Sequence, residues 1–221
     1  MGIKVTLCDK KDEVVEAWRT RFLKNPEIDI VAGDIFGCGC DAIVIPGNSF
    51  GFLDRGLEFQ AGELFGFELQ DIIRDRIRSS YSGELLVGQG FVIPCEDRLE
   101  AASACRYLVY VSASRTPQDI NGSLNAYLAA RGAFLAISEP GAEDVSSIAL
   151  PGIGTGSSGM PPEICARQMR YAYSIFAGRK GYGDKNLTRL TRRERKLRRM
   201  PKPPLEKNPT GEPEPAEPQE N

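Results

Sequence analysis

The chain has 221 residues, with 28 basic and 30 acidic side chains, a formal net charge of −2 and no histidine. The absence of histidine excludes imidazole general bases and the Ser–His and Cys–His nucleophilic systems. The six cysteines form no Cys-x-x-Cys pair, so we expect no metal site, and we expect no cofactor either. With neither a signal-peptide pattern nor a long apolar segment, the sequence favours a cytoplasmic protein that contacts no membrane.

The charge is unevenly distributed along the chain. Residues 1–177 carry 16 basic and 23 acidic side chains, a net charge of −7, whereas residues 178–221 carry 12 basic and 7 acidic side chains, a net charge of +5. The acidic body argues against DNA binding through a broad basic face. A phosphate site in this body would have to depend on local backbone dipoles rather than on the overall field.

Hydrophobic periodicity predicts strands and helices that alternate along the body of the chain. In chain order, we expect a strand over 3–8, a helix over 12–23, strands over 28–32 and 42–45, and a helical stretch over 57–81 that is interrupted near Gly62 or Gly66. A strand over 90–93, a strand over 107–111, a helix over 122–138, a strand over 147–150 and a helix over 162–176 follow. Buried strands separated by helices predict an α/β fold, a three-layer α/β/α sandwich with a mixed, mostly parallel central sheet.

The tail, residues 179–221, differs in composition from the predicted domain over 1–178. A basic run over 189–199 is predicted to be helical, with Leu190 and Leu197 one heptad apart, and proline- and glutamate-rich residues follow it. Such a composition cannot bury a core, so we expect a flexible tail. The basic run is either an arm that contacts nucleic acid or an acidic partner, or a solvated extension. The second interpretation is favoured because aromatic residues for base stacking are missing.

Polar residues follow two of the predicted strands. The strand over 28–32 ends at Gly33-Asp34, and the strand over 42–45 leads into a turn that contains Asn48. Open α/β sheets bind ligands at the carboxyl ends of their parallel strands. We therefore expect Asp34 and Asn48 to meet at one edge of the sheet, in a ligand site.

A glycine-rich loop connects the strand over 147–150 to the last helix of the body. It is formed by Gly152, Ile153, Gly154, Thr155, Gly156, Ser157, Ser158, Gly159 and Met160. Its backbone N–H groups and the helix N-terminus that follows favour an anion, and a Cβ at Gly154 or Gly156 should block the ligand while the fold survives. The alternative is an ordinary strand-to-helix turn. The loop lacks the Gly-Lys-Ser/Thr of a Walker loop and does not match the dinucleotide fingerprint.

Taken together, Gly33-Asp34-Ile35, the run from Asp41 to Asn48 and the late glycine-rich loop resemble the macro domain family, which binds ADP-ribose. The resemblance covers about residues 28–178, and the order of the three features makes it fairly specific. The turn Asn48-Ser49-Phe50-Gly51 is most similar to the bacterial, phage-tail-like branch of that family.

The resemblance implies a role for several residues. Asp34 would receive the adenine amino group, with Ile35 beside the ring. Asn48, followed by Ser49, would hold the distal ribose. Gly56 and Leu57 match the end of one loop over the diphosphate, and the loop over 152–160 matches the loop on its other side. An alternative to the role of Asp34 is that it only caps a turn.

Catalysis is less well matched than binding. Family hydrolases carry a run of glycines and then an aspartate ten residues after the asparagine; here only Gly56 remains of that run, and Glu58 occupies the tenth position. A carboxylate is the only strong general base available without histidine. Glu58 is therefore the predicted catalytic residue, with Asn48 placing the ribose and Asp54 as the alternative carboxylate. The alternative for Glu58 is an exposed residue in the first turn of a helix.

The resemblance leaves two functions open. The first is an ADP-ribosyl hydrolase that acts at the distal ribose of an ADP-ribosylated protein or nucleic acid, or on an ADP-ribose ester or phosphate. The second is a reader that binds ADP-ribose without turnover. A nucleotide-binding α/β protein outside this family is a third, weaker alternative.

Overall fold

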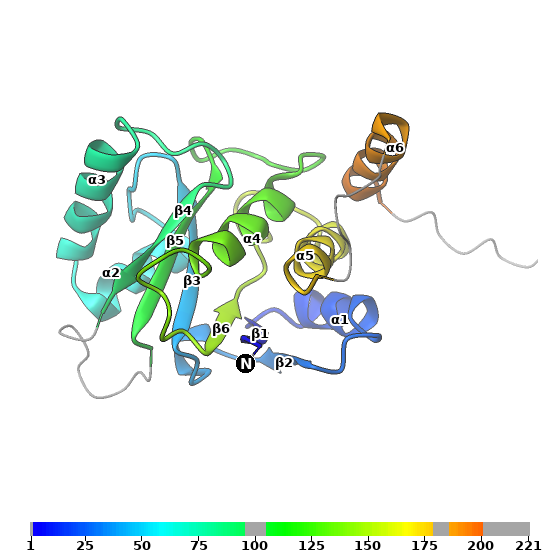
Figure 1. Cartoon of the computed structure of the whole chain (residues 1–221), viewed down its shortest axis with the longest axis horizontal. Coiled ribbons are helices and arrows are strands. Elements are labelled where there is room, and N and C mark those ends of the chain that lie inside the picture. Colours follow the sequence, from blue (N-terminus) through cyan, green and yellow to red (C-terminus); the bar gives the residue numbers. More distant parts are fainter. Residues whose placement is uncertain (1, 96–104, 179–185, 201–221) are drawn as a thin grey trace, which may run out of the picture.

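A six-stranded sheet forms the centre of the computed structural model, which describes residues 2–95, 105–178 and 186–200 (Figure 1). The strands are β1 (Lys4–Asp9), β2 (Ile28–Ala32), β3 (Ala42–Asn48), β4 (Gly90–Pro94), β5 (Tyr107–Ser114) and β6 (Ser147–Leu150). Their order in the sheet is β2-β1-β6-β3-β5-β4. The β4–β5 pair is antiparallel and the other pairs are parallel, so the predicted mixed, mostly parallel sheet is confirmed.

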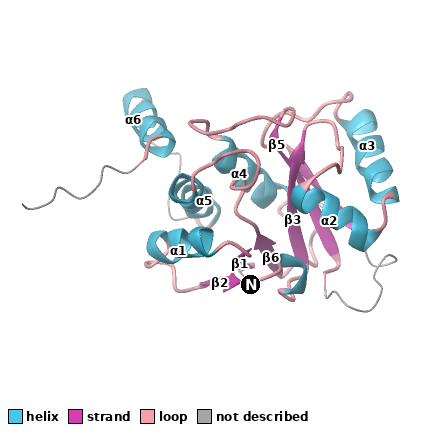
Figure 2. Cartoon of the chain, turned by 180° about the vertical axis from the view of Figure 1, so that it is seen from behind, coloured by secondary structure: helices cyan, strands magenta, loops and turns pink. Residues whose placement is uncertain are grey.

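Helices cover both faces of this sheet (Figures 1 and 2). The helices of the body are α1 (Asp12–Arg21), the short 3₁₀ helix η1 (Ile35–Gly37), α2 (Gly56–Phe65), α3 (Glu68–Ser80), α4 (Asn125–Ala136) and α5 (Pro162–Phe176). Helices α1, α4 and α5 share one hydrophobic core, and α2 and α3 share the other. Along β5, Val109 and Val111 point into the first core, whereas Leu108 and Tyr110 point into the second. This is the expected three-layer α/β/α sandwich.

Several element bounds differ from the sequence prediction. The long helical stretch breaks at Gly66, which has φ +85°, and Gly62 lies inside α2. Strand β3 runs on through Pro46 and Gly47 to Asn48 and stays paired with β5. Glycine is required at position 47, because a Cβ there would lie 2.3 Å from the hydroxyl oxygen of Tyr110. A tertiary contact therefore extends a strand that its local sequence predicts to end early.

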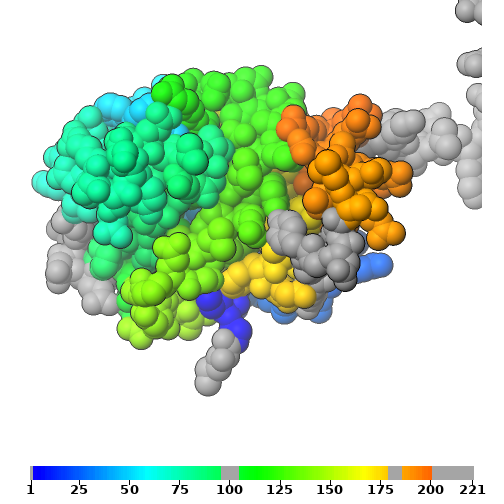
Figure 3. Space-filling model, turned by 45° about the horizontal axis from the view of Figure 1, so that its top comes forward, coloured from blue at the N-terminus to red at the C-terminus, as the bar shows by residue number. Residues whose placement is uncertain are grey.

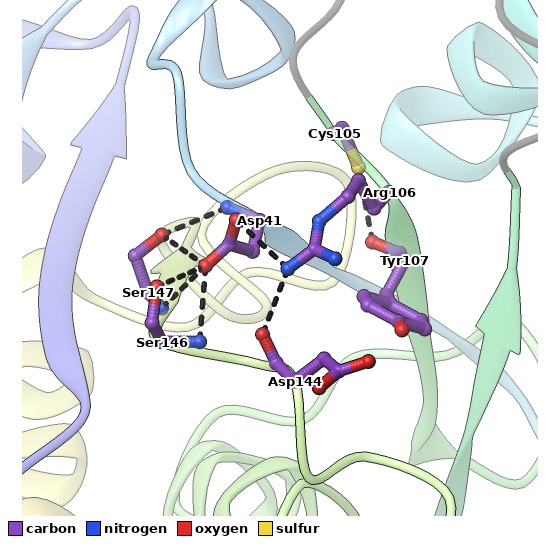
Figure 4. Close-up of polar contacts among 7 residues, drawn as sticks. All are labelled: Asp41, Cys105, Arg106, Tyr107, Asp144, Ser146 and Ser147. Carbon is purple, nitrogen blue, oxygen red and sulfur yellow. Dashed lines mark hydrogen bonds and ion pairs between the residues drawn. The ribbon is translucent and has the colours of Figure 1, made fainter. Parts of the chain in front are cut away.

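A polar cluster around Asp41 ties together the amino-terminal ends of β3, β5 and β6 (Figure 4). Asp41 Oδ2 accepts hydrogen bonds from the backbone N–H groups of Ser146 and Ser147, at 3.0 Å each. Arg106 Nη2 lies 3.3 Å from Asp41 Oδ1 and donates to the Asp144 carbonyl at 2.8 Å. Burial raises the pKa of Asp41, but the hydrogen bonds from the serines and the Arg106 charge outweigh burial and lower it to about 2. The ionised carboxylate thus fixes the edge of the sheet opposite the carboxyl ends of the parallel strands.

The basic run of the tail forms α6 (Leu187–Arg198), and this helix packs against α5. Leu197 is buried, and Gln168 Nε2 donates to its carbonyl at 3.2 Å. Arg167 Nη1 donates to the carbonyls of Lys196 and Arg199, which a helix C-terminus otherwise leaves unpaired. The predicted helix is therefore present and docked on the body. The proline- and glutamate-rich residues 201–221, expected to be flexible, lie outside the described residues.

Over the described ranges, no helix combines the length and the apolar composition needed to cross a bilayer. Within the same ranges, His, Cys, Asp and Glu side chains form no group of three or more that is arranged to hold a metal ion.

Candidate functional site

A cavity of about 490 Å³ opens at the carboxyl ends of the parallel strands and is formed by the loops after β1, β2, β3, β5 and β6. Its volume is within the range of small-molecule sites, and its position is the one where open α/β sheets bind ligands. The sequence-predicted residues in its lining are Asp34, Ile35, Asn48, Gly56, Leu57, Glu58, Gly152, Gly154, Thr155, Gly156, Ser157 and Ser158. The fold therefore brings together residues from four separate segments of the chain.

Five predicted residues lie outside the lining. Ser49 is fully buried, with its hydroxyl 3.0 Å from that of Ser112. Ile153 and Met160 belong to the core under α1 and α5. The remaining two are Asp54 and Gly159. A direct ligand contact of these five residues stays a prediction.

Other lining residues were missed by the sequence analysis. The end of β1 and the loop after it contribute Asp9, Lys10 and Lys11, and the end of β5 and the loop after it contribute residues 114 and 117–119. Both loops follow parallel strands, so the rule that identified Asp34 and Asn48 would have found them too. The two lysines add positive charge to a cavity in an otherwise acidic body.

The glycine-rich loop is held in place by contacts with the loop after β1. The Gly152 N–H donates to Asp9 Oδ2 at 3.0 Å, and Lys11 Nζ donates to the Thr155 carbonyl at 2.8 Å. Within the described residues, the backbone N–H groups of 156–158 donate to no protein acceptor. Residues 156–158 line the cavity shortly before the N-terminus of α5, so their three donors are unused by the protein and available to a ligand.

The two central glycines of this loop have different roles. A Cβ at Gly156 would meet no atom within 4 Å, as expected for a position that faces a ligand. Gly154 has φ +76°, and a Cβ there would lie 2.4 Å from Ile120 Cδ1. A side chain at Gly154 would therefore strain the backbone and displace Ile120, so it should cost stability, and the expectation that the fold survives such a change stays a prediction.

Asp34 caps a turn and also lines the cavity, so the cap is observed and contact with the adenine amino group stays a prediction. Its Oδ1 accepts from the Phe36 N–H at 3.1 Å and starts η1, and its Oδ2 pairs with Lys10 Nζ at 2.8 Å. The hydrogen bond from Lys10 lowers the pKa of Asp34, and the Phe36 N–H and the Lys10 charge act in the same direction against burial. The carboxylate is an ionised acceptor whose side chain remains half-exposed.

The Asn48 side chain organises the turn that follows β3. Its Nδ2 donates to the Phe52 carbonyl at 2.8 Å, and its Oδ1 accepts from the N–H groups of Phe50 and Phe52 at 3.1 and 3.3 Å. Tyr110 donates its hydroxyl proton to the Asn48 carbonyl at 2.8 Å. An amide has two N–H donors and two acceptor lone pairs, and only one N–H is left over by the turn. That side of the amide faces Glu58.

Glu58 lies in the first turn of α2, but only 7% of it is exposed. The alternative of an exposed helix residue is therefore wrong. Burial raises the pKa of Glu58 to about 8, and the charge of Asp54 and a hydrogen bond with it act in the same direction. Arg55 and Asn48 oppose this shift without cancelling it. The cavity thus contains a carboxyl group that exchanges its proton near neutral pH.

No family model matches the chain. Over 170 residues the chain is 28% identical to the uncharacterized protein SSO2899 of Saccharolobus solfataricus, and the alignment covers 76% of this chain and 86% of that protein.

Solved structures with the same fold are macrodomains. The macrodomain of Mycobacterium tuberculosis DarG matches with a TM-score of 0.53 and 17% identity, over 66% of this chain and 88% of that one. A mutant macrodomain of Oceanobacillus iheyensis, solved with ADPR, matches with a TM-score of 0.55 and 19% identity, over 68% of this chain and 78% of that one. The chain therefore has the macrodomain fold.

Proposed function

We propose that the cavity binds ADP-ribose or an ADP-ribosyl derivative and that the chain hydrolyses a bond at its distal ribose. The observation that carries the proposal is the meeting of three groups in one cavity: the Asp34 carboxylate, the free N–H groups of 156–158 and the buried carboxyl group of Glu58. The ADPR bound by the Oceanobacillus iheyensis macrodomain supports this choice of ligand. We also propose that the chain belongs to the bacterial, phage-tail-like branch of the macro domain family, because its turn over 48–51 resembles the turn of that branch.

Two sets of groups in the cavity suit two parts of this ligand, the adenine ring and the diphosphate. The ionised Asp34 carboxylate accepts a hydrogen bond from the adenine amino group, which a keto-bearing base cannot give. Ile35 offers an apolar contact for the ring. The free N–H groups of 156–158 and the α5 N-terminus suit the diphosphate. Lys11, which holds the loop through the Thr155 carbonyl, adds a positive charge beside it.

Glu58 is the proposed general base. With a pKa near 8, its carboxylate form is a stronger base than an ordinary glutamate, and its proton affinity is close to the optimum for catalysis near neutral pH. Burial and then the charge of Asp54 keep the pKa of Glu58 high, so we assign Asp54 a supporting role beside Glu58 rather than contact with the substrate. Asn48 fixes the turn before α2 and thereby the position of Glu58.

A reader without turnover is the second candidate, and one observation favours it. The turn over 48–52 uses three of the hydrogen-bonding positions of the Asn48 amide, and the fourth faces Glu58. The amide then has little capacity left to orient a ribose hydroxyl. Such a site would bind the diphosphate and adenine without aligning the scissile bond.

Two measurements test the proposal. Calorimetric titration with ADP-ribose tests binding, and the hypoxanthine analogue serves as the matched control for adenine recognition. Incubation with ADP-ribosylated protein and ADP-ribosylated oligonucleotide, followed by detection of free ADP-ribose, tests hydrolysis. Binding without release on either substrate supports the reader. No binding of ADP-ribose overturns both candidates.

A further inference from the structure

A second cavity, of about 630 Å³, lies between α1, α5 and α6 and has a very different lining. It is formed by Arg21, Arg167, Arg192, Arg195, Lys196, Arg199 and Met200. Six of these seven side chains are cationic and none is acidic. We refer to it as the basic cleft. The carboxylate-bearing cavity described above shares no residue with it.

The positive charge of the basic cleft is not neutralised by the protein. In the described part of the chain, none of its six cationic side chains forms an ion pair, and the one acidic residue of α6, Glu194, pairs with Arg198 instead. Burial lowers the pKa of Arg167, and the charge of Arg21 lowers it further. Like charges are thus held close together, which costs free energy unless an anion binds.

The geometry of the basic cleft suits an extended chain of anions. Arg192, Arg195 and Lys196 are three and four residues apart within α6, so they share one side of the helix over about 6 Å of its axis. Arg199 follows directly after the helix ends and extends this row of charges. Arg21 from α1 and Arg167 from α5 line the cleft from the body. A single small anion would meet only part of this surface.

We propose that the basic cleft binds the phosphodiester backbone of a nucleic acid without reading its sequence. Guanidinium groups donate paired hydrogen bonds to phosphate oxygens, and five of the six cationic residues are arginines. The lining contains no aromatic side chain on which a base could stack. Contacts to phosphates alone give affinity that depends on salt and not on sequence.

This inference is independent of the proposed ADP-ribose site. It also changes the interpretation of the basic run over 189–199, for which a solvated extension was favoured. Docking of α6 on α5 through Leu197 turns its arginines toward Arg167 and creates a concave surface that the isolated helix would not have.

Fluorescence anisotropy with the full chain tests the proposal. The probes are fluorescein-labelled oligonucleotides of about 20 nucleotides, single-stranded and duplex, each in two unrelated sequences. We expect binding to both sequences with similar affinity. Contact with about four phosphates predicts a loss of affinity of roughly 100-fold between about 50 and 200 mM salt.

The double variant Arg192→Ala/Arg195→Ala should weaken binding at least about 10-fold and reduce the slope of log affinity against log salt by about two. Both side chains are exposed, so the melting temperature should change little. The matched control is Arg76→Ala/Arg78→Ala on α3, which removes the same charge at the opposite end of the molecule (Figure 3). The control should bind like the unmodified chain.

Three outcomes would overturn the proposal. The first is no binding of any probe at about 50 mM salt. The second is an equal loss of affinity in the α6 variant and in the α3 control, since that would mean attraction by net charge alone. The third is tight binding of polyglutamate that an oligonucleotide at equal charge concentration fails to displace, which would assign the basic cleft to an acidic polypeptide.

Discussion

Lys10 and Asp34 form an ion pair in the cavity lining, with Nζ 2.8 Å from Oδ2. The two residues follow β1 and β2, which are neighbours in the sheet, so the pair joins the first two loops at its carboxyl edge. The Phe36 N–H holds the other carboxylate oxygen. Asp34 is therefore fixed in orientation before a ligand arrives, and a preorganised acceptor loses less entropy on binding.

The first prediction concerns this carboxylate. Asp34→Ala should weaken ADP-ribose binding by about 1–3 kcal/mol, because the adenine amino group would lose its partner. Calorimetric titration measures the loss. The effect should be much smaller for the hypoxanthine analogue, which has no amino group. Lys10→Ala is the control for the ion pair, because it removes the cation that pairs with Asp34 and keeps the carboxylate that would accept the adenine hydrogen bond. If Asp34→Ala binds like the unmodified chain, adenine recognition lies elsewhere.

The second prediction separates the two glycines of the loop. Gly156→Val should abolish ADP-ribose binding with unchanged circular dichroism, because its side chain would occupy open space beside the free N–H groups. Gly154→Ala should instead lower the melting temperature, because its Cβ collides with Ile120 and its φ is +76°. Normal binding by Gly156→Val would place the anion site outside this loop.

Local sequence patterns were sufficient to predict most strands and helices, but not the continuation of β3 beyond its expected end. The continuous apolar run of β5 and the periodicity of α5 are strong signals, because β5 is buried on both faces and α5 packs against a continuous core. Pro46 and Gly47 look like the end of a strand, and only the packing of the Tyr110 ring against Gly47 explains why β3 continues. Such a contact depends on a residue from another strand, which no local pattern contains.

In the candidate site too, local sequence patterns predict some features, and others depend on tertiary contacts. Asp34 and Asn48 could be placed at the ligand edge because each follows a parallel strand. The burial of Glu58 depends on how α2 packs, and its place in the first turn of a helix also allowed an exposed residue favoured by the helix dipole. The Lys10–Asp34 pair joins two loops through the pairing of β1 with β2, which the spacing of the residues does not fix.

The third prediction concerns turnover. Glu58→Gln should reduce the rate of ADP-ribose release by about 10²–10⁴-fold, as expected when general-base assistance is lost, and should change affinity for ADP-ribose only a few-fold. In the unmodified chain, the rate should rise with pH and level off above about 8, where Glu58 is ionised. Asp54→Asn should move this inflection to lower pH. A flat pH profile, or full activity of Glu58→Gln, would rule out Glu58 as the base.

The fourth prediction concerns stability against pH. Between pH 4.5 and about 8, Glu58 is protonated in the folded chain and ionised in the unfolded chain. The folded state binds the extra proton, so stability falls as pH rises through this window, by up to roughly 5 kcal/mol. Glu58→Gln cannot ionise, so its melting temperature relative to the unmodified chain should rise between about pH 5 and pH 9. Glu63→Gln, exposed on the same helix, should show no such trend. An identical trend in both variants would contradict the burial of Glu58.

The last prediction concerns the boundary near residue 178, which stays a prediction from composition. A chain ending at Gly178 should fold and bind ADP-ribose like the full chain, because α6 contributes nothing to the lining of that cavity. Its melting temperature should be lower, because α6 buries Leu197 and the Arg167 guanidinium loses the carbonyls of Lys196 and Arg199. Leu197→Ala should reproduce part of this loss, about 1–3 kcal/mol, whereas Leu190→Ala, at a half-exposed position, should cost less. Loss of ADP-ribose binding on truncation would show that α6 belongs to the ligand-binding domain.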